Sequence, residues 1–229
     1  MTAWPASVTP ASPALSALRI AYSDLTTIAL SIDEEDAWRP TRCPGWVVRD
    51  LLLQLLQDAQ AALVALATPA AGPPDRDAVT YWSDGSGNHD PEFSALRAQR
   101  TMSSAWTLTA LTRSLSDTTR AVVTLAARTP SDATLATREH MLRADDLIVT
   151  LAVEAAVHHL DLVVDLNRPG PRPEPLALVR QTLDGLLGWP APEDWSDERW
   201  ALLGTGRVPP GGRERRELGA AAAELPLLW

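Results

Sequence analysis

The strongest fold signal in this chain is the run DDLIVTLAVEAAVHHLDLVVDL, which spans residues 145–166. It contains neither proline nor glycine, and it begins with Asp145 and Asp146, whose charges favour the positive end of a helix dipole. Apolar residues fall on nearly every face of the run: Leu147, Ile148, Leu151, Val153, Val157, Leu160 and Leu162. A helix that is apolar on most faces is buried. We therefore predict a long helix here, enclosed by other helices.

Three further segments carry the three- and four-residue apolar spacing of helices. They cover residues 12–32, where Ser12 and Pro13 supply a cap and a first turn, residues 46–66, and residues 91–128, where Ser114 to Asp117 favour a break. Residues 70–90 form a long connection rich in turn residues, and residues 129–144 favour a short extended excursion. Four long helices with one long connection predict an all-α protein built as an antiparallel four-helix bundle.

The clearest boundary is Asn167 to Pro173, where three prolines in five positions stop any helix. Residues 1–166 are predicted to form the bundle. Residues 167–229 are predicted to form a small C-terminal extension that packs on it and is mostly helical or irregular. Within this extension we expect a helix over residues 175–187, a tryptophan-rich segment, a turn at residues 204–207 and a final helix near residues 213–223.

The composition excludes several classes of protein. The chain has 229 residues, 45% of them hydrophobic and 21% charged, which is typical of a globular protein. Its net charge of −9 argues against nucleic acid as a partner, because phosphate binding needs a basic face. No run approaches the roughly 18 apolar residues of a membrane span. The start of the sequence lacks the basic and apolar regions of a secretion signal, and Cys43 is the only cysteine, so we expect a cytoplasmic protein.

Three polar residues interrupt the buried run at helical spacing. Glu154, His158 and Asp161 stand at i, i+4 and i+7, so they share one helix face. A carboxylate and an imidazole one turn apart supply two ligands to a divalent metal in other bundles, although the same pair also occurs on solvated helix faces. Unpaired buried charge is costly, and a metal or a polar substrate would serve as the partner. Asp161 is placed to accept a ring N–H of His158 and to fix its tautomer.

Three motifs resemble one known family. The segment TRCPGWVVRDL, residues 41–51, is similar to the opening of the second helix in the mycothiol-dependent maleylpyruvate isomerase N-terminal family, part of the DinB-like superfamily. The segment VEAAVHHLDL, residues 153–162, resembles the motif of that family's fourth helix. The tail, with Thr205-Gly206-Arg207 and Pro226-Leu227-Leu228, is similar to the ending of many actinobacterial members. The resemblance covers most of the chain and implies a DinB-like bundle.

The resemblance also implies a metal site. In this family a histidine on the second helix joins residues matching Glu154 and His158, and the three hold a divalent ion, usually zinc. The position of that histidine, eight residues after Trp46, is Gln54 here, and an amide oxygen is a weaker zinc donor than imidazole. We expect Glu154, His158 and Gln54 as metal ligands. Asp58, one turn after Gln54, is an auxiliary oxygen donor that would favour harder ions.

The function implied by the resemblance is a mycothiol-dependent, metal-assisted transferase or isomerase that acts on a small electrophilic metabolite. The metal lowers the pKa of a bound thiol or polarises a carbonyl, and mycothiol is the thiol cosubstrate. Glu154 and His158 are then the catalytic residues. Cofactor contacts are expected from Gln54, Asp58, Trp46 and Arg207. The lysine-free, arginine-rich composition fits an actinobacterial genome.

Two other functions remain open from the sequence. Gln54 favours a divergent enzyme without metal, in which His158 is the general base, Glu154 orients it and Gln54 binds substrate. A protein that kept the scaffold without the chemistry would only bind a small molecule. Arg207 has two candidate roles, contact with an anionic ligand or a salt bridge to the fourth helix.

The remaining candidate residues carry plainer interpretations. Cys43 has no base placed beside it by the sequence, so it is not expected to be a nucleophile. His159 points about 100 degrees away from His158 on a helix and is expected to pack or to support it. His89 and His140 lie in irregular segments and are expected at the surface. The chain is expected to be a monomer or a homodimer.

Overall fold

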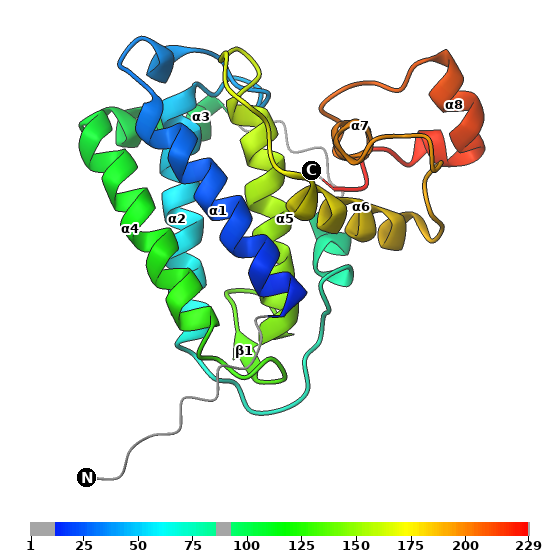
Figure 1. Ribbon diagram of the computed structural model, residues 1–229, viewed down its shortest axis with the longest axis horizontal. Coiled ribbons are helices and arrows are strands. Elements are labelled where there is room, and N and C mark those ends of the chain that lie inside the picture. Colours follow the sequence, from blue (N-terminus) through cyan, green and yellow to red (C-terminus); the bar gives the residue numbers. More distant parts are fainter. Residues whose placement is uncertain (1–11, 86–92, 229) are drawn as a thin grey trace.

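The computed structural model describes residues 12–85 and 93–228. Four helices of the described chain form a bundle (Figure 1): α1 (Pro13–Ser31), α2 (Val48–Leu66), α4 (Leu108–Ala126) and α5 (Ala144–Leu162). The all-α class predicted from the sequence is confirmed. The helices expected over residues 12–32 and 46–66 are confirmed as α1 and α2, and the central buried run is α5.

Contacts near the helix ends fix the directions of the four helices. The Ser12 hydroxyl donates to Asp145 Oδ1 at 3.0 Å, which joins the start of α1 to the start of α5. The Arg49 guanidinium donates to the Trp106 carbonyl at 2.9 Å, which joins the start of α2 to the start of α4. The Arg42 N–H donates to the Asp161 carbonyl at 3.2 Å, which joins the segment before α2 to the end of α5. The pairs α1/α4 and α2/α5 are therefore antiparallel, as predicted, whereas α1/α5 and α2/α4 run in parallel. The long stretch between α2 and α4 explains this, because α4 begins at the same end of the bundle as α2.

The predicted helix over residues 91–128 is two helices, and the predicted position of the break was wrong. Helix α3 (Phe93–Ser104) ends before Thr107, whose side chain caps α4 by accepting from the Ala110 N–H at 3.3 Å. Ser114 to Asp117 lie within α4. They do not break it because Leu111, Leu115 and Val122 give α4 a regular buried stripe, with polar residues on the other faces.

Asp50 attaches α3 to the start of α2. Its carboxylate accepts from the Ser103 hydroxyl at 2.6 Å and from Arg100 Nε at 2.7 Å, and its carbonyl accepts from Gln99 Nε2 at 2.9 Å. Asp50 also accepts from the Val47 N–H at 3.1 Å and thereby caps α2. This one residue of the 41–51 motif therefore fixes how α2 begins.

The extended excursion predicted within residues 129–144 is confirmed as a short hairpin. Strands β1 (Thr134–Ala136) and β2 (Met141–Arg143) pair antiparallel, with Leu135 opposite Leu142. The hairpin is bonded to the chain after α2, because the Ala70 N–H donates to the Thr134 carbonyl at 2.9 Å. Two short 3-10 helices lie in the connections: η1 (Asp36–Trp38) between α1 and α2, and η2 (Thr80–Gly85) between α2 and α3.

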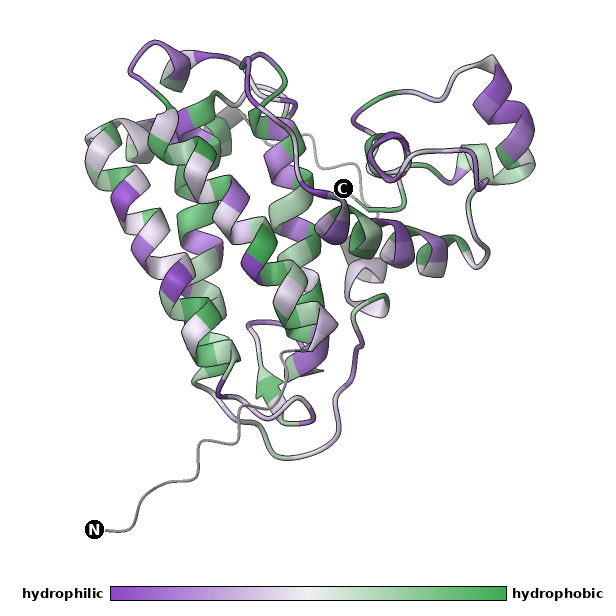
Figure 2. Ribbon diagram, viewed as in Figure 1, coloured by the Kyte–Doolittle hydropathy of each residue, from purple (hydrophilic) through white to green (hydrophobic). Residues whose placement is uncertain are grey.

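Helix α5 is enclosed by α1, α2 and α6, and apolar residues run along most of its length (Figure 2). Its buried side chains point in all directions, so the helix lacks a polar stripe. Three of its buried positions are His158, His159 and Asp161. Buried polar groups need partners, and those partners define the candidate site.

The C-terminal segment contains α6 (Pro173–Leu187), α7 (Asp197–Gly204), α8 (Gly212–Leu218) and η3 (Gly219–Ala223). Two helices near residues 175–187 and 213–223 were predicted, but α7 was not. Ser196 caps α7 by accepting from the Arg199 N–H at 3.1 Å, and Trp200 is fully buried. Apolar residues of α5, α6 and α7 share one core cluster, while α7 and α8 extend beside the bundle (Figure 1).

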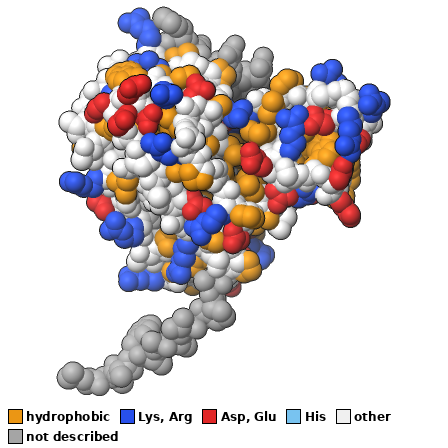
Figure 3. All heavy atoms as spheres, turned by 45° about the horizontal axis from the view of Figure 1, so that its top comes forward, with side chains coloured by type: hydrophobic (Ala, Val, Ile, Leu, Met, Phe, Trp, Pro, Cys, Tyr) orange, Lys and Arg blue, Asp and Glu red, His pale blue; other side chains and the backbone are white. Residues whose placement is uncertain are grey.

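Arginine and acidic side chains are interspersed over the face drawn in Figure 3. Arginines and acids of the described chain also form ion pairs, as Arg172 does with Asp24 at 2.8 Å and Arg213 with Glu217 at 2.7 Å. Among the described residues, no helix combines the length and the apolar content needed to cross a membrane.

Candidate functional site

The centre of the candidate site is formed by Asp58 of α2 and by Glu154 and His158 of α5. One potential ligand atom from each residue lies within 4.8 Å of the others. Glu154 and His158 come together because they are one turn apart on a helix. Asp58 joins them because α2 packs against α5. Two carboxylates and an imidazole thus converge in the interior of the bundle.

Gln54 lies one turn before Asp58 and contacts it directly. Its Nε2 donates to Asp58 Oδ1 at 2.7 Å. The other oxygen, Asp58 Oδ2, is buried and has no hydrogen-bond partner. An unpaired buried carboxylate oxygen is costly, so this atom is a point at which a proton or a cation would stabilise the cluster.

The two carboxylates oppose each other's ionisation. Burial, reinforced by the nearby charge of Asp58, raises the pKa of Glu154 well above its usual value. Burial also raises the pKa of Asp58, although His158, the Gln54 hydrogen bond and Arg138 act in the opposite direction. The pair therefore favours a bound proton or cation.

The two tyrosines of the chain lie within electrostatic reach of this pair. Burial raises the pKa of Tyr22, on α1, and the charges of Glu154 and Asp58 raise it further. Burial and the charge of Glu154, followed by Glu139 and Asp58, raise the pKa of Tyr81, in η2, to about 12. Both hydroxyls therefore stay protonated at neutral pH and are available as donors.

Asp161 holds His158 from the other side. Its Oδ2 lies 3.1 Å from His158 Nδ1, and the guanidinium of Arg207 donates to both of its oxygens, at 3.1 Å to Oδ1 and 2.9 Å to Oδ2. Burial alone would raise the pKa of Asp161, but the hydrogen bonds from His158 and Arg207 outweigh it and lower the pKa to about 2. Of the two roles considered for Arg207, the structure shows the salt bridge to the fourth bundle helix, α5.

Cys43 contacts the same carboxylate. Its Sγ lies 3.4 Å from Asp161 Oδ2, and together with His158 and Asp161 it forms a second group of potential metal ligands. Burial and the negative charge of Asp161 raise the pKa of the Cys43 thiol to about 12. Since the thiolate is the metal-binding form and Arg207 already neutralises Asp161, this second group is less suited to a metal than the first.

The structure also places the remaining predicted residues. Trp46 packs beside the core formed by α1, α2 and α4 near the start of α2, and it is not one of the three converging ligands. His159 is buried and faces away from His158, with Nε2 3.1 Å from the Pro169 carbonyl. His140 lies 3.7 Å from Asp75 through Nδ1, while His89 falls outside the described residues.

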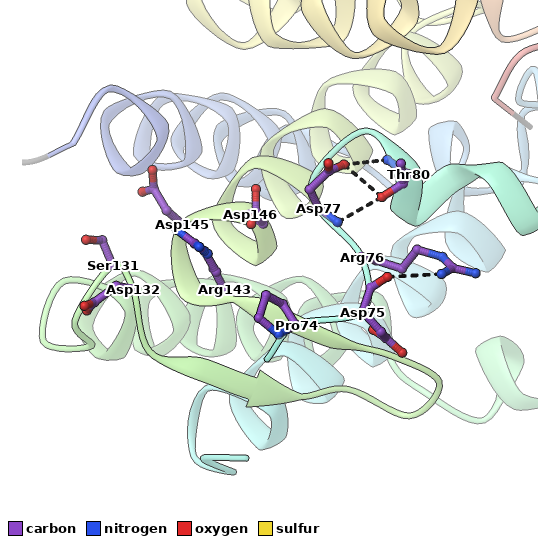
Figure 4. A pocket seen from close by; sticks show the side chains of 10 residues that line it. All are labelled: Pro74, Asp75, Arg76, Asp77, Thr80, Ser131, Asp132, Arg143, Asp145 and Asp146. Carbon is purple, nitrogen blue, oxygen red and sulfur yellow. Dashed lines mark hydrogen bonds between the residues drawn. The ribbon is translucent and has the colours of Figure 1, made fainter. Parts of the chain in front are cut away.

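A separate hollow of about 600 Å³ lies at the start of α5 (Figure 4). Its lining includes five aspartates, four of which accept hydrogen bonds. Asp75 accepts from the Met141 N–H at 2.8 Å. Asp145 accepts from the Ser12 hydroxyl, Asp146 accepts from the Ala78 N–H at 3.2 Å, and Asp77 accepts from the Val79 and Thr80 N–H groups. These bonds account for the four acids as structural groups.

Sequence reasoning identified the helical pair Glu154 and His158, and Asp58 as an auxiliary donor. It missed Tyr22, Tyr81 and the contact between Cys43 and Asp161. Tyr22 lies within an apolar stripe, where a tyrosine is indistinguishable from a core residue in a single sequence, and Tyr81 lies in a connection without a helical pattern. The Cys43 contact joins positions 118 residues apart. None of these carried a local signal.

Comparison with known proteins supports the fold. A family model described as Mycothiol maleylpyruvate isomerase N-terminal domain matches residues 18–163, more than half of the chain. No curated protein matches the sequence. Crystal structures of a mycothiol-dependent maleylpyruvate isomerase and of a histidine-to-alanine mutant each align with a TM-score of 0.55 and 13% identity, over 78% of this chain and 70% of the other. At that identity the likeness concerns the fold alone.

Proposed function

This chain belongs to the mycothiol maleylpyruvate isomerase N-terminal domain family, and on that premise we propose that it is a thiol-dependent, metal-assisted transferase or isomerase. Its substrates would be mycothiol and a small electrophilic metabolite. The observation that supports the metal is the convergence of Asp58, Glu154 and His158 within 4.8 Å. The other predictions, of a monomer or homodimer with no nucleic-acid partner, remain part of this proposal.

The residues present fit a divalent cation. Asp58 Oδ2 is a buried acceptor without a partner, and a cation beside the two carboxylates would offset the burial and the repulsion by Asp58 that raise the pKa of Glu154. We propose Asp58 as the third ligand in place of Gln54, since the Gln54 amide is engaged with Asp58. Two carboxylates and one imidazole suit zinc and also the harder manganese ion.

A metal held by these side chains would lower the pKa of a thiol or polarise a carbonyl. The protein's own side chains would orient the metal ligands and bind the substrate. Gln54 holds the Asp58 carboxylate in one orientation, Asp161 holds the imidazole of His158, and the hydroxyls of Tyr22 and Tyr81 donate hydrogen bonds to an anionic substrate oxygen. Burial keeps competing water away from these contacts.

Metal analysis tests the proposal directly. Protein purified without added ions and then equilibrated with Zn²⁺ or Mn²⁺ should retain about one ion per chain. Asp58→Asn, Glu154→Gln and His158→Gln should each weaken binding at least about tenfold, or about 1.4 kcal/mol. Asp146→Asn, a change of an acid on the same helix but in the other hollow, is the matched control. Less than about 0.1 ion per chain after equilibration would overturn the metal site.

A second function is favoured by the contact between His158 and Asp161. An imidazole oriented by a buried carboxylate is also the arrangement of a general base, and it needs no metal. In that case turnover with thiol and electrophile would survive EDTA and Asp58→Asn but not His158→Ala. Under the metal-assisted mechanism, all three treatments abolish turnover.

A further inference from the structure

The C-terminal segment reaches into the bundle through one side chain, Arg207. This arginine follows α7, yet its guanidinium binds both carboxylate oxygens of Asp161 on α5 and also donates to the Thr205 carbonyl at 3.1 Å. The Arg207 side chain is 10% exposed and that of Asp161 is 0% exposed. A bidentate pair of this kind fixes the plane of the carboxylate as well as its position.

The fixed carboxylate determines which ring nitrogen of His158 carries the proton. An ionised carboxylate only accepts hydrogen bonds, so in the neutral form of the ring the His158 Nδ1 atom, 3.1 Å from Asp161 Oδ2, must carry the N–H. The lone pair of the ring is then at Nε2. A histidine that binds a metal or acts as a base through Nε2 needs this tautomer, in which the Nδ1–H group donates to a carboxylate.

The turn that carries Arg207 is itself anchored. Gly206 has a φ of +69°, a conformation that favours glycine, and a Cβ there would lie 3.0 Å from Pro226. The Leu227 N–H donates to the Gly204 carbonyl at 2.8 Å, and the Val208 N–H donates to the Leu202 carbonyl at 3.1 Å. These contacts hold the turn on α7, which shares its core with α5.

We propose that Arg207 is a positioning residue that acts through Asp161 to hold His158 as the Nδ1–H tautomer, so that the C-terminal segment completes the site in the bundle. The inference rests on the proposed function in one respect: Nε2 of His158 is the atom that binds the metal or accepts a proton. It does not depend on whether a metal binds. The hydrogen bonds of Arg207 within the described part of the chain go to Asp161 and Thr205, and not to Asp58 or Glu154.

The test measures the tautomer of His158 by ¹⁵N chemical shifts of the histidine rings in the full-length protein, with His158→Gln to assign the signal. Wild type should show the Nδ1–H form. Arg207→Gln should lower its population, and Arg207→Lys, which keeps the charge, should restore part of it. Arg199→Gln removes a comparable two-bond pair with Glu214, between α7 and α8, and should leave the signal unchanged.

Zinc affinity supplies a second readout, since loss of a group that orients a ligand typically weakens binding 10–100-fold. A folded Arg207→Gln that keeps the wild-type tautomer overturns the inference, whatever its zinc affinity. A changed tautomer in a protein that binds no metal supports the inference and overturns the metal site. If Arg207→Gln does not fold, the double variant Asp161→Asn with Arg207→Gln, which removes both charges of the pair, must lose the Nδ1–H preference for the inference to stand.

Discussion

The amide of Gln54 donates a 2.7 Å hydrogen bond to Asp58, and this contact organises the side of the site that faces α2. It orients one carboxylate oxygen and leaves the other, Oδ2, buried and without a partner. The family resemblance implies histidine at position 54. In this chain the acid one turn after Gln54, Asp58, lies next to Glu154 and His158.

The first prediction concerns Gln54→His. Imidazole is a better zinc donor than an amide, so this variant should bind zinc about tenfold more tightly than wild type, a gain of about 1.4 kcal/mol. Isothermal titration calorimetry measures the change. Gln60→His, at an exposed position of the same helix, is the control. Equal affinities of the two variants would show that position 54 does not face the metal.

The second prediction is that Glu154→Gln stabilises the protein in the absence of metal. Burial and the charge of Asp58 raise the pKa of Glu154, so this carboxyl group lowers the stability of the fold at neutral pH relative to low pH, and a neutral amide removes that penalty. We expect the free energy of unfolding to rise by about 1–3 kcal/mol, the usual cost of a buried unsatisfied polar group. Urea titration in EDTA at pH 7 measures it, and a decrease would contradict the proposed repulsion.

The third prediction gives the pH dependence of the metal-free protein. Glu154 and Asp58 have pKa values raised on folding, so the folded state binds more protons than the unfolded chain. Their contribution to stability is complete below the unfolded carboxyl pKa, about 4, and is lost as the pH rises through the raised values. Asp161 acts in the opposite sense, because its pKa falls from 3.8 to about 2, and its contribution is lost as the pH falls through that window.

Urea titrations from pH 2 to pH 8 therefore should give a maximum of stability near pH 4, with a decline on both sides. The decline above the maximum should be shallower in Glu154→Gln, and the decline below it should be shallower in Asp161→Asn. Stability that increases steadily from pH 4 to pH 8 in EDTA would contradict the pKa shifts of the carboxylate pair.

The fourth prediction is that Cys43 reacts slowly in the folded protein. Burial and Asp161 raise its pKa to about 12, so the reactive thiolate is a very small fraction at pH 8. Alkylation by iodoacetamide should be at least about 100-fold slower than in urea-unfolded protein, in line with a pKa near 8.5 for an unperturbed thiol. Rapid alkylation of the folded chain would identify Cys43 as a nucleophile instead.

The fifth prediction concerns Gly206→Ala. A φ of +69° and the contact with Pro226 make alanine strained, at a cost of about 1–2 kcal/mol. Because this turn carries Arg207, zinc affinity should fall as well. Gly72→Ala, also at positive φ but with open space around it, should lose stability without loss of affinity. If both variants changed zinc affinity equally, the prediction that the turn at Gly206 supports the zinc site would be contradicted.

The sequence by itself determined the elements whose causes are local. Apolar spacing and caps located α1, α2 and α5, and the period of a helix placed Glu154 and His158 on one face before any fold was known. The same reasoning failed at the break between α3 and α4 and at α7, since Thr107 and Ser196 are cap residues of a kind that also occurs within helices and loops.

Only the tertiary structure decided which distant groups complete the site. Asp58 reaches Glu154 because α2 packs against α5, and Arg207 reaches Asp161 across 46 residues of sequence. The parallel pairs α1/α5 and α2/α4 likewise depend on the long connection between α2 and α4, which brings the chain back to the end of the bundle where α2 begins. These contacts join segments that are far apart in the sequence, so no local spacing of residues predicts them. They are set by the packing of the helices, in which buried polar groups are paired with one another.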